Sequence, residues 1–137
     1  MLPEIWGQHA WNFIHLLTLG YPQNPSETEK TQYRNFFYAL IYVLPCKKCC
    51  HNLAANINKY PLTDNILSSR NSFVKWGIDL HNAVNLHTGK DPLSYKDALN
   101  EINKLMNVNK KEDNTVYYVL LFTIVIVAFI WYYYSKS

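Results

Sequence analysis

The sequence predicts an all-α protein, built as a four-helix bundle with a short fifth helix and followed by a C-terminal transmembrane helix. Two observations carry the helical part of this prediction. Apolar residues recur at helical spacing in successive segments of the first 107 residues, and no alternating strand pattern competes with them. A third observation predicts the membrane helix, because residues 116–134 form a run of 19 without a charged side chain.

The first two helices are bounded by clear signals. The first ends at the turn of residues 20–22, where glycine and proline interrupt the helical pattern. The second begins at Ser26, with Glu29 three residues on in the arrangement of a capping box, and it stops before Pro45. The apolar positions of the two helices are Leu2, Trp6, Ala10, Phe13, Ile14 and Leu17, and then Tyr33, Phe36, Phe37, Leu40, Ile41 and Leu44.

Three further helices complete the predicted domain. The third begins near Cys46 and runs to Tyr60. The fourth ends near Gly89, because glycine readily takes the left-handed conformation that closes a helix. The fifth begins at Ser94, with Asp97 three residues on. Their apolar positions are Leu53 and Ile57, then Phe73, Trp76, Leu80 and Val84, then Leu99, Ile102 and Leu105.

The apolar run has the length and the ends of a membrane span. A helix of 19 residues is roughly 28 Å long, close to the hydrocarbon thickness of a bilayer. Aromatic residues stand at both ends, where they favour the membrane interface. The N-terminus has no basic and then apolar signal segment, so a tail anchor is expected. The predicted organisation is a domain at 1–107, a polar tether at 108–115, the anchor at 116–134 and a short tail at 135–137.

Charge contributes less to the prediction. The formal net charge of +3 is too small to argue for nucleic-acid binding, so no nucleic-acid partner is expected. Lys110 and Lys111 precede the apolar run, and Lys136 alone follows it. Because cytoplasmic flanks of membrane helices are enriched in basic residues, this asymmetry places the main domain on the cytoplasmic side.

Three cysteines cluster at positions 46, 49 and 50, which is too few for a disulfide-stapled mini-domain. Cys46 and Cys49 form a C-x-x-C motif at a predicted helix start, and three interpretations are open. A redox pair is favoured by the helix N-terminus and by Lys47 and Lys48, which stabilise a thiolate. Three thiols packed as small apolar side chains are the second interpretation. The third is a zinc site, with ligands drawn from Cys46, Cys49, Cys50, His51 and His81.

A thioredoxin-like fold is not expected, because its motif lies in a βαβ context and this chain shows no strand pattern. Four motifs follow one another instead. They are Trp6-Gly7-x-x-x-Trp11-x-x-x-His15, Tyr21-Pro22-x-x-Pro25, Pro45-Cys46-x-x-Cys49, and Trp76-x-x-x-x-His81-Asn82-x-Val84-Asn85 with Gly89-Lys90. The spacing puts Trp11 and His15 on one helix face, and His81 and Asn85 on another. Over residues 5–106 the set resembles the Erv/ALR family of FAD-linked sulfhydryl oxidases.

The resemblance implies a flavin site beside the C-x-x-C motif, with FAD held non-covalently at the mouth of the helical bundle. It implies that Cys46 and Cys49 are the catalytic pair, with Cys49 next to the flavin and Cys46 exchanging with incoming dithiols. Lys90 is expected to meet the pyrophosphate, and no metal is expected. The full set of expected cofactor-binding residues is Gly7, Trp11, His15, Cys49, His51, Trp76, His81, Asn82, Val84, Asn85, Lys90 and Tyr95.

The implied activity is oxidation of dithiols to disulfides. A substrate dithiol attacks Cys46, the freed Cys49 thiolate reduces the flavin, and FAD passes the electrons to oxygen as hydrogen peroxide. The implied partners are protein dithiols or a small thioredoxin-like carrier, and the implied assembly is a homodimer. The short form with one cysteine pair most resembles enzymes of large cytoplasmic DNA viruses, so a host membrane or a virion is the expected location.

Two departures and two alternatives complete the prediction. Family members often carry arginine where this chain has Gln8, which puts one phosphate contact in question. Cys50 has no role in the family pattern. The alternatives are a tail-anchored zinc-binding adaptor and a structural membrane protein, and neither accounts for the tryptophan–histidine and His-Asn-x-Val-Asn motifs.

Overall fold

The computed structural model describes residues 1–107 and 115–136, and in these residues it is helical without strands. The chain divides into two compact units, Met1–Leu105 and Met106–Ser137. The prediction of an all-helical chain is therefore confirmed, whereas the predicted tether lies outside the described residues but for its last position. The elements in order are α1 (Pro3–Leu19), α2 (Glu27–Val43), α3 (Lys47–Lys59), the short 3-10 helix η1 (Ile66–Ser68), α4 (Arg70–His87), α5 (Tyr95–Asn107) and α6 (Thr115–Ser135).

Side chains that precede the helices satisfy the free N–H groups of their first turns. The predicted capping box is present at α2, where the Ser26 N–H donates to the Glu29 carboxylate over 2.7 Å and the Glu29 N–H donates to Ser26 Oγ over 3.3 Å. Ser69 Oγ accepts from the Ser72 N–H at the start of α4. At α3 the cap is the sulfur of Cys46, which accepts from the Cys49 N–H. The serine and cysteine positions therefore fix where these helices begin.

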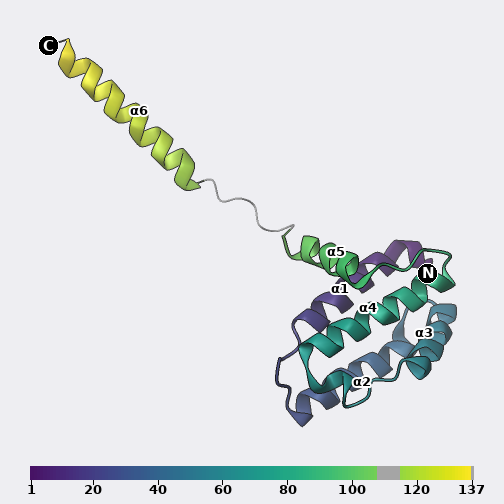
Figure 1. Ribbon diagram of the computed structural model, residues 1–137. Helices are drawn as coiled ribbons and strands as arrows, with labels where there is room; N and C mark the ends of the chain where they lie inside the picture. The colour runs from purple at the N-terminus through teal and green to yellow at the C-terminus, as the bar shows by residue number, and fades with distance from the viewer. Residues whose placement is uncertain (108–114, 137) are drawn as a thin grey trace. The chain divides into compact units, whose positions relative to one another are not determined.

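One apolar core joins the four long helices of the first unit, which Figure 1 shows packed side by side. Its most enclosed part is aromatic: Trp76 meets Phe37 edge-on at 4.9 Å between ring centroids and stacks on Phe73 at 5.6 Å. Burying large rings stabilises a small domain strongly, because each removes much apolar surface from water. The core residues are Ile14 and Tyr21, Phe37 of α2, Leu53 and Ile57 of α3, Leu62, Leu67, and Phe73, Trp76 and Leu80 of α4.

A glycine allows α4 to approach α1 closely. A Cβ placed on Gly77 would stand 3.1 Å from Thr18 Cγ2, which is tighter than ordinary side-chain contacts allow. Thr18 is itself fully buried, and its hydroxyl donates to the His15 carbonyl over 2.9 Å. The close contact matters for the site described below, because it brings His15 of α1 near His81 of α4.

The segment after α4 reverses the direction of the chain. It lets α5 pack on the side of α4 that faces away from the aromatic core. Gly89 has a φ of +73°, a left-handed conformation that suits glycine, and it ends α4 as predicted. The Asn82 side chain then holds the connection through two 2.9 Å bonds with the backbone of Leu93. Beyond it, α5 buries Ala98 and Ile102 against Val74 and Ile78 of α4.

The short helix η1 is absent from the sequence prediction. Its three residues are too few to show a periodic pattern, yet Leu67 is fully buried and its carbonyl accepts from the Tyr21 hydroxyl over 2.9 Å. The bond therefore connects the beginning of the α1–α2 turn to the segment just before α4.

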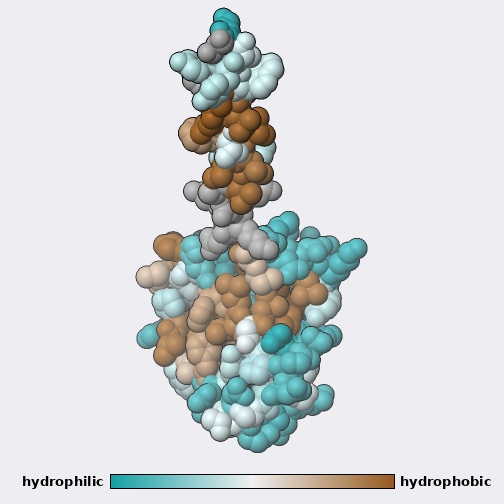
Figure 2. Space-filling model, turned by 90° about the vertical axis from the view of Figure 1, so that its left-hand side faces the viewer, coloured by the Kyte–Doolittle hydropathy of each residue, from teal (hydrophilic) through white to brown (hydrophobic). Residues whose placement is uncertain are grey.

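The second unit is dominated by α6. Its residues Val116–Ser135 have a mean hydropathy of 2.1 and form the one helix in the described part of the chain that is long and apolar enough to cross a membrane. Figure 2 shows this helix hydrophobic along its middle and paler at the end drawn uppermost, where tyrosines gather at 132–134. This pattern matches the predicted apolar run with aromatic ends.

Candidate active site

The redox motif is built into the first turn of α3. Cys46 is the residue that caps the helix, and its sulfur accepts from the Cys49 N–H over 3.1 Å. Because the two positions lie one helical turn apart, their Cα atoms are 5.1 Å apart and the sulfurs are joined in a disulfide. Cys50 stays free, and its thiol donates to the Leu44 carbonyl over 3.5 Å.

A cavity of about 580 Å³ opens beside this bond, and we call it the disulfide pocket. Both bonded cysteines line it, and its other walls come from α1, α2 and α4. The volume lies within the range of about 300–1,000 Å³ that is usual for small-molecule sites. The side chains that define its walls are Trp6, Trp11, Ile14, Leu40, Leu44, Cys46, Lys48, Cys49, Leu53, Val84 and His87.

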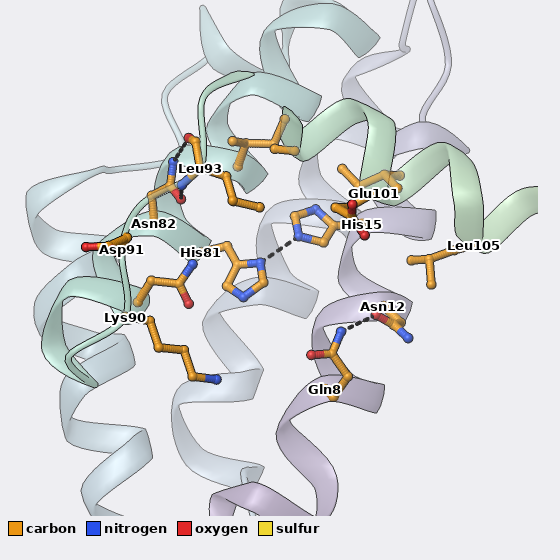
Figure 3. A pocket seen from close by; sticks show the side chains of 14 residues that line it. Gln8, Asn12, His15, His81, Asn82, Lys90, Asp91, Leu93, Glu101 and Leu105 are labelled. Carbon is orange, nitrogen blue, oxygen red and sulfur yellow. Dashed lines mark hydrogen bonds between the residues drawn. The ribbon is translucent and has the colours of Figure 1, made fainter. Parts of the chain in front are cut away.

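A second cavity of about 340 Å³ lies between α1, α4 and α5, and we call it the histidine pocket (Figure 3). Its walls are more polar, with amide side chains, two imidazoles and one lysine. Gln8 donates to Asn12 over 2.8 Å on the α1 side. The side chains that define its polar part are Gln8, Asn12, His15, His81, Asn82, Asn85, Lys90, Asp91 and Glu101.

Helical periodicity divides α1 and α4 between the two cavities. On α1, residues 7, 10, 11 and 14 line the disulfide pocket, whereas residues 8, 12 and 15 line the histidine pocket. On α4, residues 84 and 87 line the disulfide pocket, whereas residues 78, 81, 82 and 85 line the histidine pocket. Positions three or four apart share a face of a helix, so each helix presents one face to each cavity.

An aromatic stack joins the two cavities. Trp11, which lines the disulfide pocket, stacks on His81, which lines the histidine pocket, with ring centroids 4.1 Å apart and an angle of 8° between the planes. His15 is the third ring of this group, and its Nε2 lies 2.9 Å from Nδ1 of His81. These three rings therefore lie between the two cavities, where a ligand that occupies both would contact them.

Both imidazoles are held in their neutral form. Burial lowers the pKa of His15 from 6.5 to about 4. Burial likewise lowers the pKa of His81 from 6.5 to about 4, with smaller contributions from His15 and Lys90. Neutrality is consistent with the bond between them, in which one ring donates and the other accepts.

These shifts predict that the protein loses stability in acid. In the folded protein His15 and His81 have a pKa of about 4, whereas in the unfolded chain they return to the ordinary value of 6.5. Between pH 4 and 6.5 the unfolded chain therefore binds more protons than the folded protein. The free energy of unfolding is therefore expected to rise from pH 4 to 6.5 and then to be flat with respect to these groups. Denaturant unfolding at a series of pH values measures it. His15→Gln is expected to reduce the slope, whereas substitution of the exposed His9 is not, and equal slopes in all three proteins would contradict the assignment.

The structure brings most of the predicted site residues to the two cavities. Gly7, Trp11, Val84 and both bonded cysteines line the disulfide pocket. His15, His81, Asn82, Asn85 and Lys90 line the histidine pocket.

Three predicted residues lie elsewhere. Trp76 is in the core, where its indole N–H donates to the Tyr60 carbonyl over 2.8 Å, and it lines neither cavity. His51 is exposed on the helix surface behind the cysteines, and Tyr95 is exposed at the start of α5. Neither contributes to the walls of the two cavities.

Other wall residues are missing from the sequence prediction. Trp6 belongs to the first motif but not to the expected cofactor-binding set, Leu44 is expected as a helix-core position, and Lys48 is expected only to stabilise a thiolate. Asn12 and His87 have no role in the prediction. Helical spacing is the signal that relates them to predicted residues. Asn12 follows Gln8 by one turn and precedes His15 by another, and His87 follows Val84 in the same way.

Unpaired polar atoms at both cavities fit a ligand with hydrogen-bonding groups. Three side-chain atoms of the described residues are buried without a partner, of which His15 Nδ1 and Trp6 Nε1 belong to cavity-lining residues and Asn56 Nδ2 does not. His15 is only 6% exposed and lines the histidine pocket, while Trp6 lines the disulfide pocket. A buried polar group without a partner is costly, so such groups point to a bound molecule. Flat apolar walls beside a disulfide, joined by an aromatic stack to a polar cavity with a lysine, suit the flavin and adenosine ends of FAD.

The fold and this site define a class of protein: a helical domain that carries a redox disulfide on the wall of a cofactor-sized cavity. A family model described as Erv1 / Alr matches residues 8–116. The chain belongs to the Erv1/Alr family, and the predicted family resemblance is confirmed.

Viral proteins are among its relatives. The chain is 49% identical over 119 residues to a protein of Acanthamoeba polyphaga mimivirus named as a probable FAD-linked sulfhydryl oxidase, covering 87% of this chain and 83% of that one. It is 30% identical over 95 residues to an African swine fever virus protein named as an FAD-linked sulfhydryl oxidase, covering 69% and 77%.

Solved structures share the fold. The crystal structure of the yeast Erv1 core is similar with a TM-score of 0.63 at 20% identity, covering 82% of this chain and 86% of that one. A structure described as the FAD binding domain of Saccharomyces cerevisiae Erv1 has a TM-score of 0.64 at 23% identity, covering 69% and 87%.

Proposed function

We propose that this protein is an FAD-dependent thiol oxidase, which forms disulfide bonds in substrate proteins and passes the electrons to oxygen to give hydrogen peroxide. The observation that carries the proposal is the Cys46–Cys49 disulfide on the wall of a cavity large enough for a flavin ring. Membership of the Erv1/Alr family, whose viral, fungal and plant members are named as FAD-linked sulfhydryl oxidases, supports it.

The cysteine pair exchanges with the substrate. A substrate thiolate attacks the Cys46 sulfur, the Cys46–Cys49 bond breaks, and Cys49 leaves as a thiolate. The second substrate thiol then attacks the mixed disulfide, which releases the oxidised substrate and returns Cys46 to the thiol form. The N-terminus of α3 stabilises the negative charge on Cys49, because the free N–H groups of a first helical turn favour anions. Lys48, on the wall of the same cavity, adds a positive charge.

The two cavities together hold the cofactor. When bound, FAD supplies the two-electron acceptor for the cysteine pair and the reaction with oxygen. Trp6, Trp11 and Val84 present flat or apolar surface in the disulfide pocket. In the histidine pocket, Lys90 is the one lysine or arginine among the described wall residues, and the carboxylates of Asp91 and Glu101 line the same cavity. A pyrophosphate there depends on Lys90 and on amide donors, because Gln8 brings no charge.

The domain boundaries and the membrane location belong to the same proposal. Residues 1–107 form the oxidase domain as a four-helix bundle with a fifth helix, 116–134 form a transmembrane anchor, and the rest are tether and tail. The length and hydropathy of α6 support the anchor. The excess of lysine before it favours a domain that faces the cytoplasm, on a host membrane or a virion, as the viral relatives suggest.

A homodimer is the proposed assembly. Its support is apolar surface on the first unit, some of which Figure 2 shows on the face turned to the viewer. Four apolar side chains are exposed there: Leu2, which precedes α1, and Ile5, Phe13 and Leu16 within it. Contiguous exposed apolar surface is typical of a surface that another protein covers.

The alternatives have less support. Cys46 and Cys49 are joined in a disulfide, whereas a zinc site would need both as thiolates. A purely structural protein has no need of a disulfide on a cavity wall. The zinc-binding adaptor and the structural protein are therefore not favoured.

Two measurements on the full chain in non-ionic detergent test the proposed activity. The purified protein is expected to be yellow, with the visible absorbance bands of a flavin. Dithiothreitol is expected to bleach these bands when oxygen is excluded and to drive oxygen uptake with formation of hydrogen peroxide when it is present. A colourless protein, or a coloured one without thiol-dependent oxygen uptake, would overturn the proposal.

A further inference from the structure

Basic residues gather on the part of the chain that carries the redox disulfide. Residues 30–63 hold five of the 13 Lys and Arg and none of the ten Asp and Glu. The rest of the chain is therefore slightly acidic, with eight basic side chains against ten acidic ones. Two of the five, Lys30 and Arg34, are paired with Glu27 and Asp64 just outside this range, so the charges without a salt bridge are Lys47, Lys48 and Lys59.

Two of these lysines stand between the catalytic cysteines. Lys47 and Lys48 are the first two residues of α3, and both are exposed. No acidic residue lies in that first turn. Four other basic side chains of the described residues form salt bridges, Lys30, Arg34, Lys75 and Lys104, but neither Lys47 nor Lys48 is among them. Their charges therefore face solvent without local compensation.

The surroundings keep the electrostatic potential positive. The free N–H groups at the start of α3 add to the field of the two lysines. Among the described residues that line the disulfide pocket, Glu4 at the start of α1 is the one carboxylate. Lys47 is exposed and follows Cys46 directly without lining that cavity, whereas Lys48 lies on the cavity wall.

We propose that Lys47 and Lys48 select substrates whose dithiol is flanked by acidic residues. This inference rests on the proposed thiol oxidase function and names the class of protein substrate that the site takes. Complementary charges accelerate encounter and fix orientation more than they tighten a complex. They also favour the attacking species, because the substrate must present a thiolate to Cys46. The exchange itself is unchanged: the substrate loses two electrons and two protons, and the cysteine pair gains the electrons.

A pair of peptides tests the selection. Both contain the same Cys-x-x-Cys dithiol, flanked by glutamates in one and by glutamines in the other. The readout is kcat/KM from oxygen uptake by the full chain with bound FAD in non-ionic detergent at low ionic strength. Because glutamates also alter the reactivity of the peptide thiols, the quantity compared between enzymes is the ratio of the two peptides. This ratio isolates the coupling between enzyme and substrate charges.

Lys47→Glu is expected to lower the ratio about tenfold, a size that reversal of an exposed charge beside several others produces. Because Lys47 also stabilises the thiolate of the cysteine pair, its reversal is expected to slow dithiothreitol as well, and the ratio of the two peptides cancels this common loss. Lys59→Glu makes the same charge change at the other end of α3 and is expected to leave the ratio unchanged. High salt is expected to reduce the preference of the unaltered protein.

The inference is overturned if Lys47→Glu leaves the ratio unchanged, which includes the case in which both peptides slow equally. It is also overturned if Lys59→Glu has the same effect as Lys47→Glu. Dithiothreitol turnover by the unaltered protein separates the two levels of the argument. Turnover with an unchanged ratio overturns the substrate selection alone. Absence of turnover overturns the proposed function, and the selection with it.

Discussion

Replacing Cys49 with serine is expected to abolish thiol-dependent oxygen uptake, with a loss of about three orders of magnitude or more, as is usual when a covalent nucleophile is removed. The hydroxyl cannot form the bond with Cys46 that a substrate thiol must break. Flavin binding is expected to survive, since serine is smaller than cysteine and the other walls of the disulfide pocket are untouched. The measurement is oxygen consumption with dithiothreitol, alongside the visible spectrum of the same sample.

Cys50→Ser is the matched control. Cys50 follows Cys49 directly, but its thiol donates to the Leu44 carbonyl and lines neither cavity. The same change one position further along is therefore expected to leave the rate within about twofold, because a serine hydroxyl can donate to the same carbonyl and the position is partly exposed. Full activity in Cys49→Ser, or equal losses in the two variants, would refute the assignment of the catalytic pair.

Local signals in the sequence predicted the helices well. The capping box at Ser26 and the glycine at position 89 stand where the structure starts α2 and ends α4. These features depend on neighbouring residues, so they can be read from the chain. The short helix η1 could not be predicted, because it is held by a contact between Tyr21 and Leu67, far apart in sequence. Such a contact is set by packing.

The residues of the site show the same difference between local signals and long-range packing. Motif residues at helical spacing, such as His15 and His81, meet because Gly77 lets their helices approach. The division of α1 into two cavity-lining faces could not be predicted, since it depends on where α5 packs. For that reason the predicted cofactor-binding residues do not include Asn12, although it lies one helical turn from Gln8.

Trp76 is where the motif and the packing disagree most. The tryptophan opens the fourth motif and was expected at the cofactor, yet it is 2% exposed among Phe37 and Phe73. Trp76→Ala is expected to lower the free energy of unfolding by about 3–5 kcal/mol, the usual cost of emptying a large core position. That is a large share of the roughly 5–15 kcal/mol that stabilises a typical domain. Thermal unfolding of the full chain in detergent, followed by near-ultraviolet circular dichroism, is expected to show a Tm lower by more than about 10 °C.

Trp76→Phe separates a core role from a cofactor role. Phenylalanine keeps an aromatic ring against Phe37 and Phe73 but removes the N–H that donates to the Tyr60 carbonyl. The expected loss is about 1–3 kcal/mol, the cost of a smaller ring and a carbonyl left without its partner. Because Trp76 lines neither cavity, the flavin affinity of the folded variant is expected to match that of the unaltered protein. A variant that keeps its Tm and loses its flavin would instead assign Trp76 to the cofactor, as the motif alone suggests.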